Sequence, residues 1–254
     1  MADVSLEKLL ETGAHFGHQT KRWNPKMEEF VYGVRQGVYI FDLIKTRKAI
    51  EDGLNEIEAA AKDKKLILLL GTKKQVKEHV KRIGQLADIA YVDERWLGGT
   101  LTNFEQIKAS VKTLNKLKED MAAGLYKEYT KKERLLLNRK IEKLEKTVGG
   151  LQKLTKLPDL MIIVDTKRER AAVLEAQKLK VDIVGIVDTN GDPHDSTYPI
   201  PMNDDSPQAL TYIMGLIEQA LMVKASPTKK KTAKEDTPKK ATKKVTKKGV
   251  KETK

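Results

Sequence analysis

The segment LMIIVDTKRERAAVLEAQKLKVDIVGIV, residues 160–187, has an apolar run at each end and a helical pattern between them. The runs are Leu160–Val164 and Ile183–Val187. Continuous apolar runs of this length are typical of parallel strands covered on both faces. The residues between them recur at the spacing of one helical face: Ala172, Val173, Ala176 and Leu179. Strand, helix and strand in this order predict a right-handed crossover within a parallel sheet.

The same alternation continues in both directions along the chain. Short apolar runs predict further strands at Lys65–Leu70 and Ile89–Val92. Helical spacing predicts helices at Leu43–Lys62, at Lys73–Ala87 with Thr72 as N-cap, and after Ser206-Pro207. The predicted fold class is α/β, with a mainly parallel, doubly wound sheet of the flavodoxin or Rossmann-like kind.

One segment departs from this alternation. Asn103 and Gln106 have the spacing of a capping box, which would open one helix, and a break at Gly124–Thr130 separates it from a second. Apolar residues follow each helix in steps of three and four, namely Phe104, Ile107, Val111, Leu114 and Met121, then Leu137, Ile141, Leu144, Val148 and Leu151. One narrow apolar seam among dense charges predicts an antiparallel helical hairpin that protrudes from the sheet. The alternative is a pair of ordinary helices lying on the sheet.

The positive charge of the chain is concentrated at its C-terminal end. The formal net charge is +13, but residues 224–254 hold 13 Lys and three acids, which leaves 36 basic and 33 acidic side chains before them. The tail has no aromatic residue and too little apolar surface to fold alone, so we predict a disordered, Lys-rich tail. The remainder should bind nucleic acid, if at all, through local patches.

Composition excludes several classes of protein. There is no Cys, which excludes disulfides and thiolate metal sites. No apolar run is long enough to span a membrane, and MADVSLEKLLE lacks the layout of a signal peptide, so we expect a cytoplasmic protein with no membrane partner. The predicted organisation is an α/β domain (1–102 and 152–223), an inserted coiled-coil hairpin (103–151) and the tail (224–254).

The segment GAHFGHQTKRWNPKM, Gly13–Met27, is rich in cations and rings and contains no acid. It shows no helical or strand period, and Gly13, Gly17 and Pro25 interrupt any regular element. Cations pair with phosphates and rings stack on unpaired bases, so the mixture suits folded RNA. The alternative is a surface loop with Phe16 and Trp23 tucked beneath it. The candidate RNA contacts are His15, His18, Gln19, Lys21, Arg22, Trp23, Asn24 and Lys26.

A second candidate contact is RWLGGTLTNF, residues 95–104. Two successive glycines allow a close approach by another backbone or a sharp turn into a helix. We expect Trp96 and Leu97 to anchor the turn, with Arg95 and the amides of Gly98 and Gly99 facing outward. The candidate RNA contacts here are Arg95, Gly98, Gly99, Thr100 and Asn103.

These two segments, with PDLMIIVDTKRERAAVLEAQ (158–177) and IVDTN followed by NDDSPQA (186–209), occur in the order found in one family. The chain resembles the bacterial ribosomal small-subunit protein number two. Asp182 stands where the family pattern has Pro, which affects only the entry to the following strand. The resemblance implies a structural constituent of the small subunit, without enzyme activity or cofactor, and a protruding coiled coil. It also implies contact with 16S rRNA near the head–body junction and with other small-subunit proteins, including help in docking the messenger-capturing ribosomal protein number one.

The competing interpretation is a nucleotide- or phosphate-binding α/β enzyme. The predicted strand ends place Gly71-Thr72, Asp165–Lys167 and Asp188–Asn190 at one edge of the sheet, where such folds bind ligands. However, neither GxxxxGK[ST] nor GxGxxG occurs, and Gly71 stands where a receiver-type site needs acids. Helix capping and turn formation explain these residues better.

A metal site built on His15 and His18, with His194 and Asp195, is a weaker possibility. A spacing of three suits metal ligands only on a helix, and the flanking glycines oppose one. We therefore predict no metal.

Overall fold

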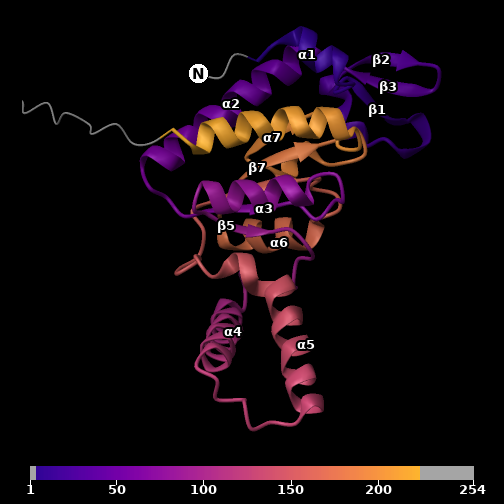
Figure 1. The fold of residues 1–254 in the computed structure, drawn as a ribbon. Coiled ribbons are helices and arrows are strands. Elements are labelled where there is room, and N and C mark those ends of the chain that lie inside the picture. The colour runs from indigo at the N-terminus through magenta and orange to yellow at the C-terminus, as the bar shows by residue number, and fades with distance from the viewer. Residues whose placement is uncertain (1–3, 224–254) are drawn as a thin grey trace, which may run out of the picture.

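The computed structural model describes residues 4–223 and contains one five-stranded parallel sheet in the order β5-β4-β6-β7-β8 (Figure 1). The strands are β4 (Ile67–Leu70), β5 (Ala90–Val92), β6 (Leu160–Val164), β7 (Asp182–Val187) and β8 (Tyr198–Pro201). The predicted mainly parallel α/β fold is confirmed. The sequence patterns did not indicate β8, an edge strand with two prolines. The predicted tail lies outside the described residues.

Helices cover both faces of this sheet. They are α1 (Leu6–Glu11), α2 (Leu43–Lys62), α3 (Lys77–Leu86), α6 (Arg170–Leu179) and α7 (Pro207–Leu221). Alternate strand residues enter two separate apolar clusters. Leu69 and Ile162 pack on the side of α2, α3 and α7, whereas Leu68 and Met161 pack on the side of α6 and the hairpin base. Burial on both faces explains why the central strands are continuously apolar.

A second, three-stranded antiparallel sheet lies at one end of the molecule (Figure 1). It comprises β1 (Phe16–Gln19), β2 (Val31–Arg35) and β3 (Val38–Phe41), in the order β1-β3-β2. The prediction that Gly13–Met27 lacks regular structure was therefore wrong. Pairing with β3 makes β1 a strand despite Gly17, and an irregular register between Phe16 and Gln19 disguises its pattern. Short 3₁₀ turns follow at Thr20–Arg22 and Pro25–Phe30.

The inserted segment forms α4 (Phe104–Ala122) and α5 (Lys131–Val148), which extend from the sheet on the side opposite β1–β3 (Figure 1). The predicted protruding hairpin is present. The capping box at Asn103 was a wrong prediction, because its side chain makes no capping hydrogen bond. Instead α5 has the capping box, formed by Thr130 and Glu133.

Two predicted details near the sheet edge had different outcomes. Ser206 caps α7 as expected, with its side chain accepting a hydrogen bond from the amide of Ala209. Thr72 does not cap α3, which begins only at Lys77, because its hydroxyl donates to the Glu169 carboxylate instead. No helix in residues 4–223 is long and apolar enough to cross a membrane.

Candidate nucleic-acid interface

The carboxyl ends of β4, β6 and β7 bring one lysine together with several carboxylates. Lys73 is only 8% exposed, and its Nζ lies 2.9 Å from an Asp165 oxygen, 2.8 Å from an Asp204 oxygen and 2.8 Å from an Asp205 oxygen. Asp188, at the end of β7, accepts a hydrogen bond from the Asp204 amide at 3.3 Å. The predicted strand ends therefore meet, but as a mainly acidic cluster.

The electrostatics of this cluster oppose phosphate binding. Burial alone would lower the pKa of Lys73, but the carboxylates of Asp204, Asp205 and Asp165 outweigh that effect and raise it. Burial, together with the charges of Asp188 and Asp165, raises the pKa of Asp204. The positive charge of Lys73 is thus already balanced by the surrounding carboxylates. An added anion would be repelled by those carboxylates.

The segment Gly13–Met27 docks directly on this edge. The His18 amide donates to Thr189 Oγ1 at 2.8 Å, and the Asn24 amide donates to the Thr189 carbonyl at 2.7 Å. A Cβ at Gly17 would lie 2.4 Å from Thr189 Cγ2, so only glycine permits this close approach. The two segments that the sequence suggested for different ligands are in fact two halves of one internal contact.

His18 is the central side chain of that contact. Its Nδ1 lies 3.1 Å from an Asp188 oxygen, and its Nε2 lies 2.8 Å from the side-chain nitrogen of Asn190. The hydrogen bond with Asp188 raises the pKa of His18, with burial acting in the opposite direction and further support from Asp204 and Asp205. His18 therefore holds the segment in place, and its ring is mostly covered.

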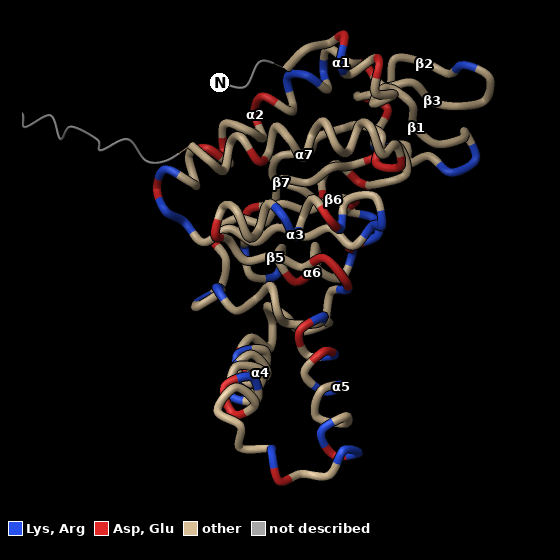
Figure 2. The backbone as a smooth tube through the Cα atoms, viewed as in Figure 1, with Lys and Arg blue, Asp and Glu red and all other residues tan. Residues whose placement is uncertain are grey.

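The exposed part of the segment is its basic tip. Gln19, Lys21, Arg22 and Lys26 are exposed, whereas His15, His18, Trp23 and Asn24 are partly buried. The cations of the tip are visible in the loop after β1 (Figure 2). Trp23 stacks on Tyr39 with ring centroids 4.6 Å apart, and the Lys26 ammonium pairs with Asp192 at 2.5 Å. Within the described residues, Lys21 and Arg22 have no ion-pair partner and are the free cations of the segment.

The second candidate segment, Arg95–Asn103, is held by one carboxylate that sequence reasoning missed. Glu175 on α6 accepts hydrogen bonds from Trp96 Nε1 at 3.0 Å, from the Gly99 amide at 2.8 Å and from the Leu101 amide at 2.9 Å. It also accepts from the amide and the hydroxyl of Thr102, at 3.1 Å and 3.2 Å. An acid on a predicted helix gave no local signal of this role.

The outward-facing part of this segment is smaller than expected. Arg95, Gly98 and Asn103 are exposed, and Arg95 has no ion pair within residues 4–223. The amide of Gly99 faces Glu175, so the expectation that both glycine amides face outward was wrong for Gly99. Thr100 is 1% exposed, and its hydroxyl donates to the Leu97 carbonyl. Its side chain therefore stabilises the turn from inside.

Known proteins match a range of the chain that includes both segments. The model of the family described as ribosomal protein S2 matches residues 9–223. The small ribosomal subunit protein uS2 of Geotalea uraniireducens (strain Rf4) is 44% identical over 222 residues, which is 87% of this chain and 87% of that protein. The chain belongs to the ribosomal protein S2 family.

In this S2-family chain, two of the residues considered and rejected as metal ligands make other contacts. Asp195 is paired with Arg170, and His18 is committed to Asp188. Among the described residues, no group of three or more His, Cys, Asp or Glu side chains is placed to hold a metal ion.

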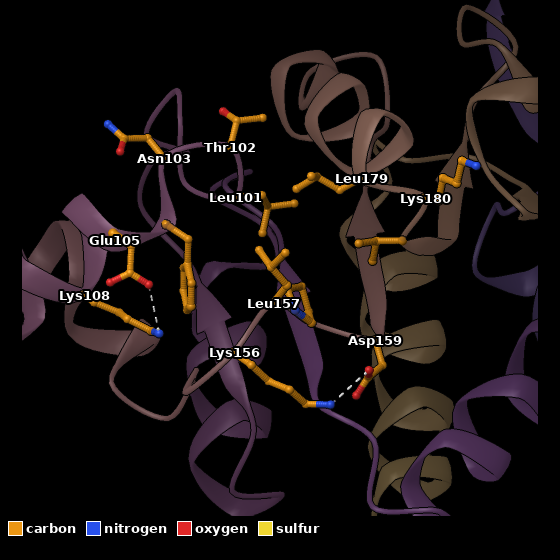
Figure 3. Close-up of a pocket in the computed structure, with 13 residues that line it drawn as sticks. Leu101, Thr102, Asn103, Glu105, Lys108, Lys156, Leu157, Asp159, Leu179 and Lys180 are labelled. Carbon is orange, nitrogen blue, oxygen red and sulfur yellow. Dashed lines mark hydrogen bonds and ion pairs between the residues drawn. The ribbon is translucent and has the colours of Figure 1, made fainter.

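One further feature of the S2-family chain had no sequence signal. A groove of about 840 Å³ lies at the base of the hairpin, where Leu101, Leu157 and Leu179 form apolar lining (Figure 3). Two exposed ion pairs, Lys108 with Glu105 and Lys156 with Asp159, lie at its rim, both at 3.3 Å. The groove therefore has an apolar interior and a rim of nearly balanced charge.

Proposed function

We propose that this chain is a structural constituent of the small ribosomal subunit and binds 16S rRNA near the head–body junction, in the cytoplasm. The observation that carries the proposal is the free, exposed pair Lys21 and Arg22 on a segment that is hydrogen-bonded to the sheet edge on either side of the pair, at His18 and Asn24. A positioned cation binds a phosphate without the entropy cost of ordering a flexible loop. Membership of the S2 family agrees with this function.

The remaining contacts proposed for the first segment divide into two groups. Gln19 and Lys26 are exposed and can face RNA directly, although Lys26 must exchange its partner Asp192 for a phosphate. His15, Trp23 and Asn24 are partly buried and present only an edge to a base or sugar. We further propose that the chain helps to dock the messenger-capturing ribosomal protein number one, with the hairpin as a strut against rRNA or a neighbouring protein.

The proposed function includes no catalysis. The alternative site at Gly71-Thr72, Asp165–Lys167 and Asp188–Asn190 is disfavoured because its buried lysine is surrounded by carboxylates. The hydroxyls of Thr72 and Thr189 are also engaged in hydrogen bonds. Thr72 donates to Glu169, and Thr189 accepts from the His18 amide of the first segment.

The experiment is to change Lys21 and Arg22 to Ala and measure binding to small subunits that lack this protein, across a salt series. Each lost phosphate contact should reduce the log–log salt slope by roughly 0.7–0.9. Changing Lys48 and Lys178 to Ala is the matched control, because both are exposed and have no ion pair among the described residues, and the loss of charge is equal. We expect weaker binding and a smaller slope only for the first variant, and less protein number one on its subunits. If the two variants show the same log–log salt slope for subunit binding, rRNA binding through this segment is refuted.

A further inference from the structure

Glu175 saturates its carboxylate with donors from one turn. One oxygen accepts from Trp96 Nε1 and the Gly99 amide, and the other accepts from the Leu101 amide and from both donors of Thr102. The acceptor lies 73 to 79 residues away from these donors, on α6. The turn from Arg95 to Thr102 therefore takes its shape from a helix that is distant in the sequence.

A carboxylate is suited to this position for a chemical reason. An ionised carboxyl offers two acceptor oxygens with about four lone-pair sites and no donor of its own, so the five donors of the turn fill it completely, with some of them sharing a site. Burial would raise the pKa of Glu175, but the hydrogen bonds from Trp96 and from the amides of Thr102, Gly99 and Leu101 outweigh it and lower the pKa. The group is thus charged at neutral pH. A glutamine would replace one oxygen by a donor and leave amides of the turn unsatisfied.

The turn holds two outward groups that the fold itself does not use. Within residues 4–223, the Gly98 amide donates to no acceptor and Arg95 has no ion pair. A Cβ built at Gly98 meets no atom within 4 Å, whereas Gly99 needs its positive φ of 89°. The fold therefore explains glycine at position 99 but gives no reason for it at position 98. A bare, outward backbone beside a free guanidinium suits the close approach of a phosphate.

We propose that Glu175 is the positioning residue of a second RNA-binding surface, in which Arg95 and the Gly98 backbone contact an rRNA phosphate. The inference rests on the proposed function but concerns a different segment from the one that carries Lys21 and Arg22. Glu175 does not touch RNA in this arrangement. It fixes the turn that presents the two contacting groups.

The first test uses Gly98→Ala, measured with protein-free 16S rRNA and with small subunits lacking this protein. Because the position is open, the melting temperature should not change, while RNA affinity should fall roughly threefold or more as the methyl group blocks the close approach. Gly215→Ala is the matched control, since a Cβ built at Gly215 also meets no atom within 4 Å. Unchanged affinity of Gly98→Ala for both targets would overturn the contact.

The second test is a double-mutant cycle of Arg95→Ala and Glu175→Gln. If Glu175 acts by positioning Arg95, the arginine substitution should lower affinity in the native background and have little further effect when Glu175 is already changed. Glu169→Gln, at the N-cap position of α6, controls for the loss of a carboxylate from this element. Additive effects of the two substitutions would overturn the positioning role even if both variants are less stable.

The outcomes separate this inference from the proposed function. If the native chain does not bind rRNA or subunits, the proposed function fails. If it binds, and Lys21 and Arg22 matter while Arg95, Gly98 and Glu175 do not, only this inference fails. Effects seen with subunits but absent with protein-free rRNA would show that the turn contacts a neighbouring protein, which also overturns the inference.

Discussion

The two segments proposed to contact RNA are held in opposite ways. Gly13–Met27 is fixed by many separate contacts, including the Thr189 hydroxyl and carbonyl, the His18–Asp188 pair and the close approach of Gly17. In Arg95–Asn103, Trp96 and Leu101 are buried in the apolar cluster, but all the hydrogen bonds from α6 come from the single carboxylate of Glu175. Distributed contacts should make the first segment tolerant of losing one hydrogen bond, whereas one substitution at Glu175 removes every hydrogen bond that α6 makes to the second.

The largest expected effect is a difference in stability between alanine substitutions at two glycines, Gly17 and Gly98. Gly17→Ala would place a methyl group 2.4 Å from Thr189 Cγ2 and 2.9 Å from its Oγ1. We expect a loss of about 1–3 kcal/mol in the free energy of unfolding, as for other overpacked sites. Gly98→Ala, which meets no neighbouring atom, should change it by less than about 0.5 kcal/mol.

Chemical denaturation of the two variants measures this difference. Equal stability of Gly17→Ala and the native chain would mean that the first segment can withdraw from Thr189, and the contrast between the segments would be lost.

An intermediate effect, dependent on pH, is expected at His18. Its folded-state pKa is raised above 6.5, so the protonated ring stabilises the fold below that value and loses this contribution as pH rises through the folded pKa. Relative to His18→Gln, the native chain should be more stable by about 1 kcal/mol near pH 6 and by less at pH 8. Unfolding in urea at several pH values would show it.

His79→Gln is the control for that measurement, because this histidine faces Thr211 at 3.4 Å and no carboxylate within the described contacts. A difference between native and His18→Gln that stays constant from pH 6 to pH 8 would contradict the role of the Asp188 pair.

Sequence reasoning succeeded where burial leaves a continuous or periodic pattern. The central strands β4, β6 and β7 and the faces of α2 and α7 were predicted because each is covered by apolar neighbours. The sheet β1–β3 was not predicted, since much of β2 is exposed and the register of β1 with β3 is irregular. Strand β8 contains two prolines, which do not indicate a strand.

The candidate interface was predictable only in part for a related reason. Local composition indicated the cations at positions 21 and 22 and the paired glycines at 98 and 99. Their supports are distant in the chain. His18 meets Thr189 across 171 residues, and Gly99 meets Glu175 across 76. Nothing in the local pattern of α6 distinguishes Glu175 from an ordinary solvated acid, so only the tertiary structure reveals which residues shape the interface.

A small effect on stability is also expected at Lys26. Its ammonium lies 2.5 Å from an Asp192 oxygen, but the lysine side chain is 55% exposed, so water screens the pair. Lys26→Ala should therefore change the free energy of unfolding by less than about 0.5 kcal/mol. Asp192→Ala should instead strengthen RNA binding slightly, because it releases the ammonium for a phosphate. Both variants are measured by urea unfolding and by rRNA affinity at low salt. The results distinguish a lysine that only supports the segment from one that can leave Asp192 and bind a phosphate. If both variants bind RNA like the native chain, Lys26 belongs to the support of the segment and the RNA contacts are confined to its tip.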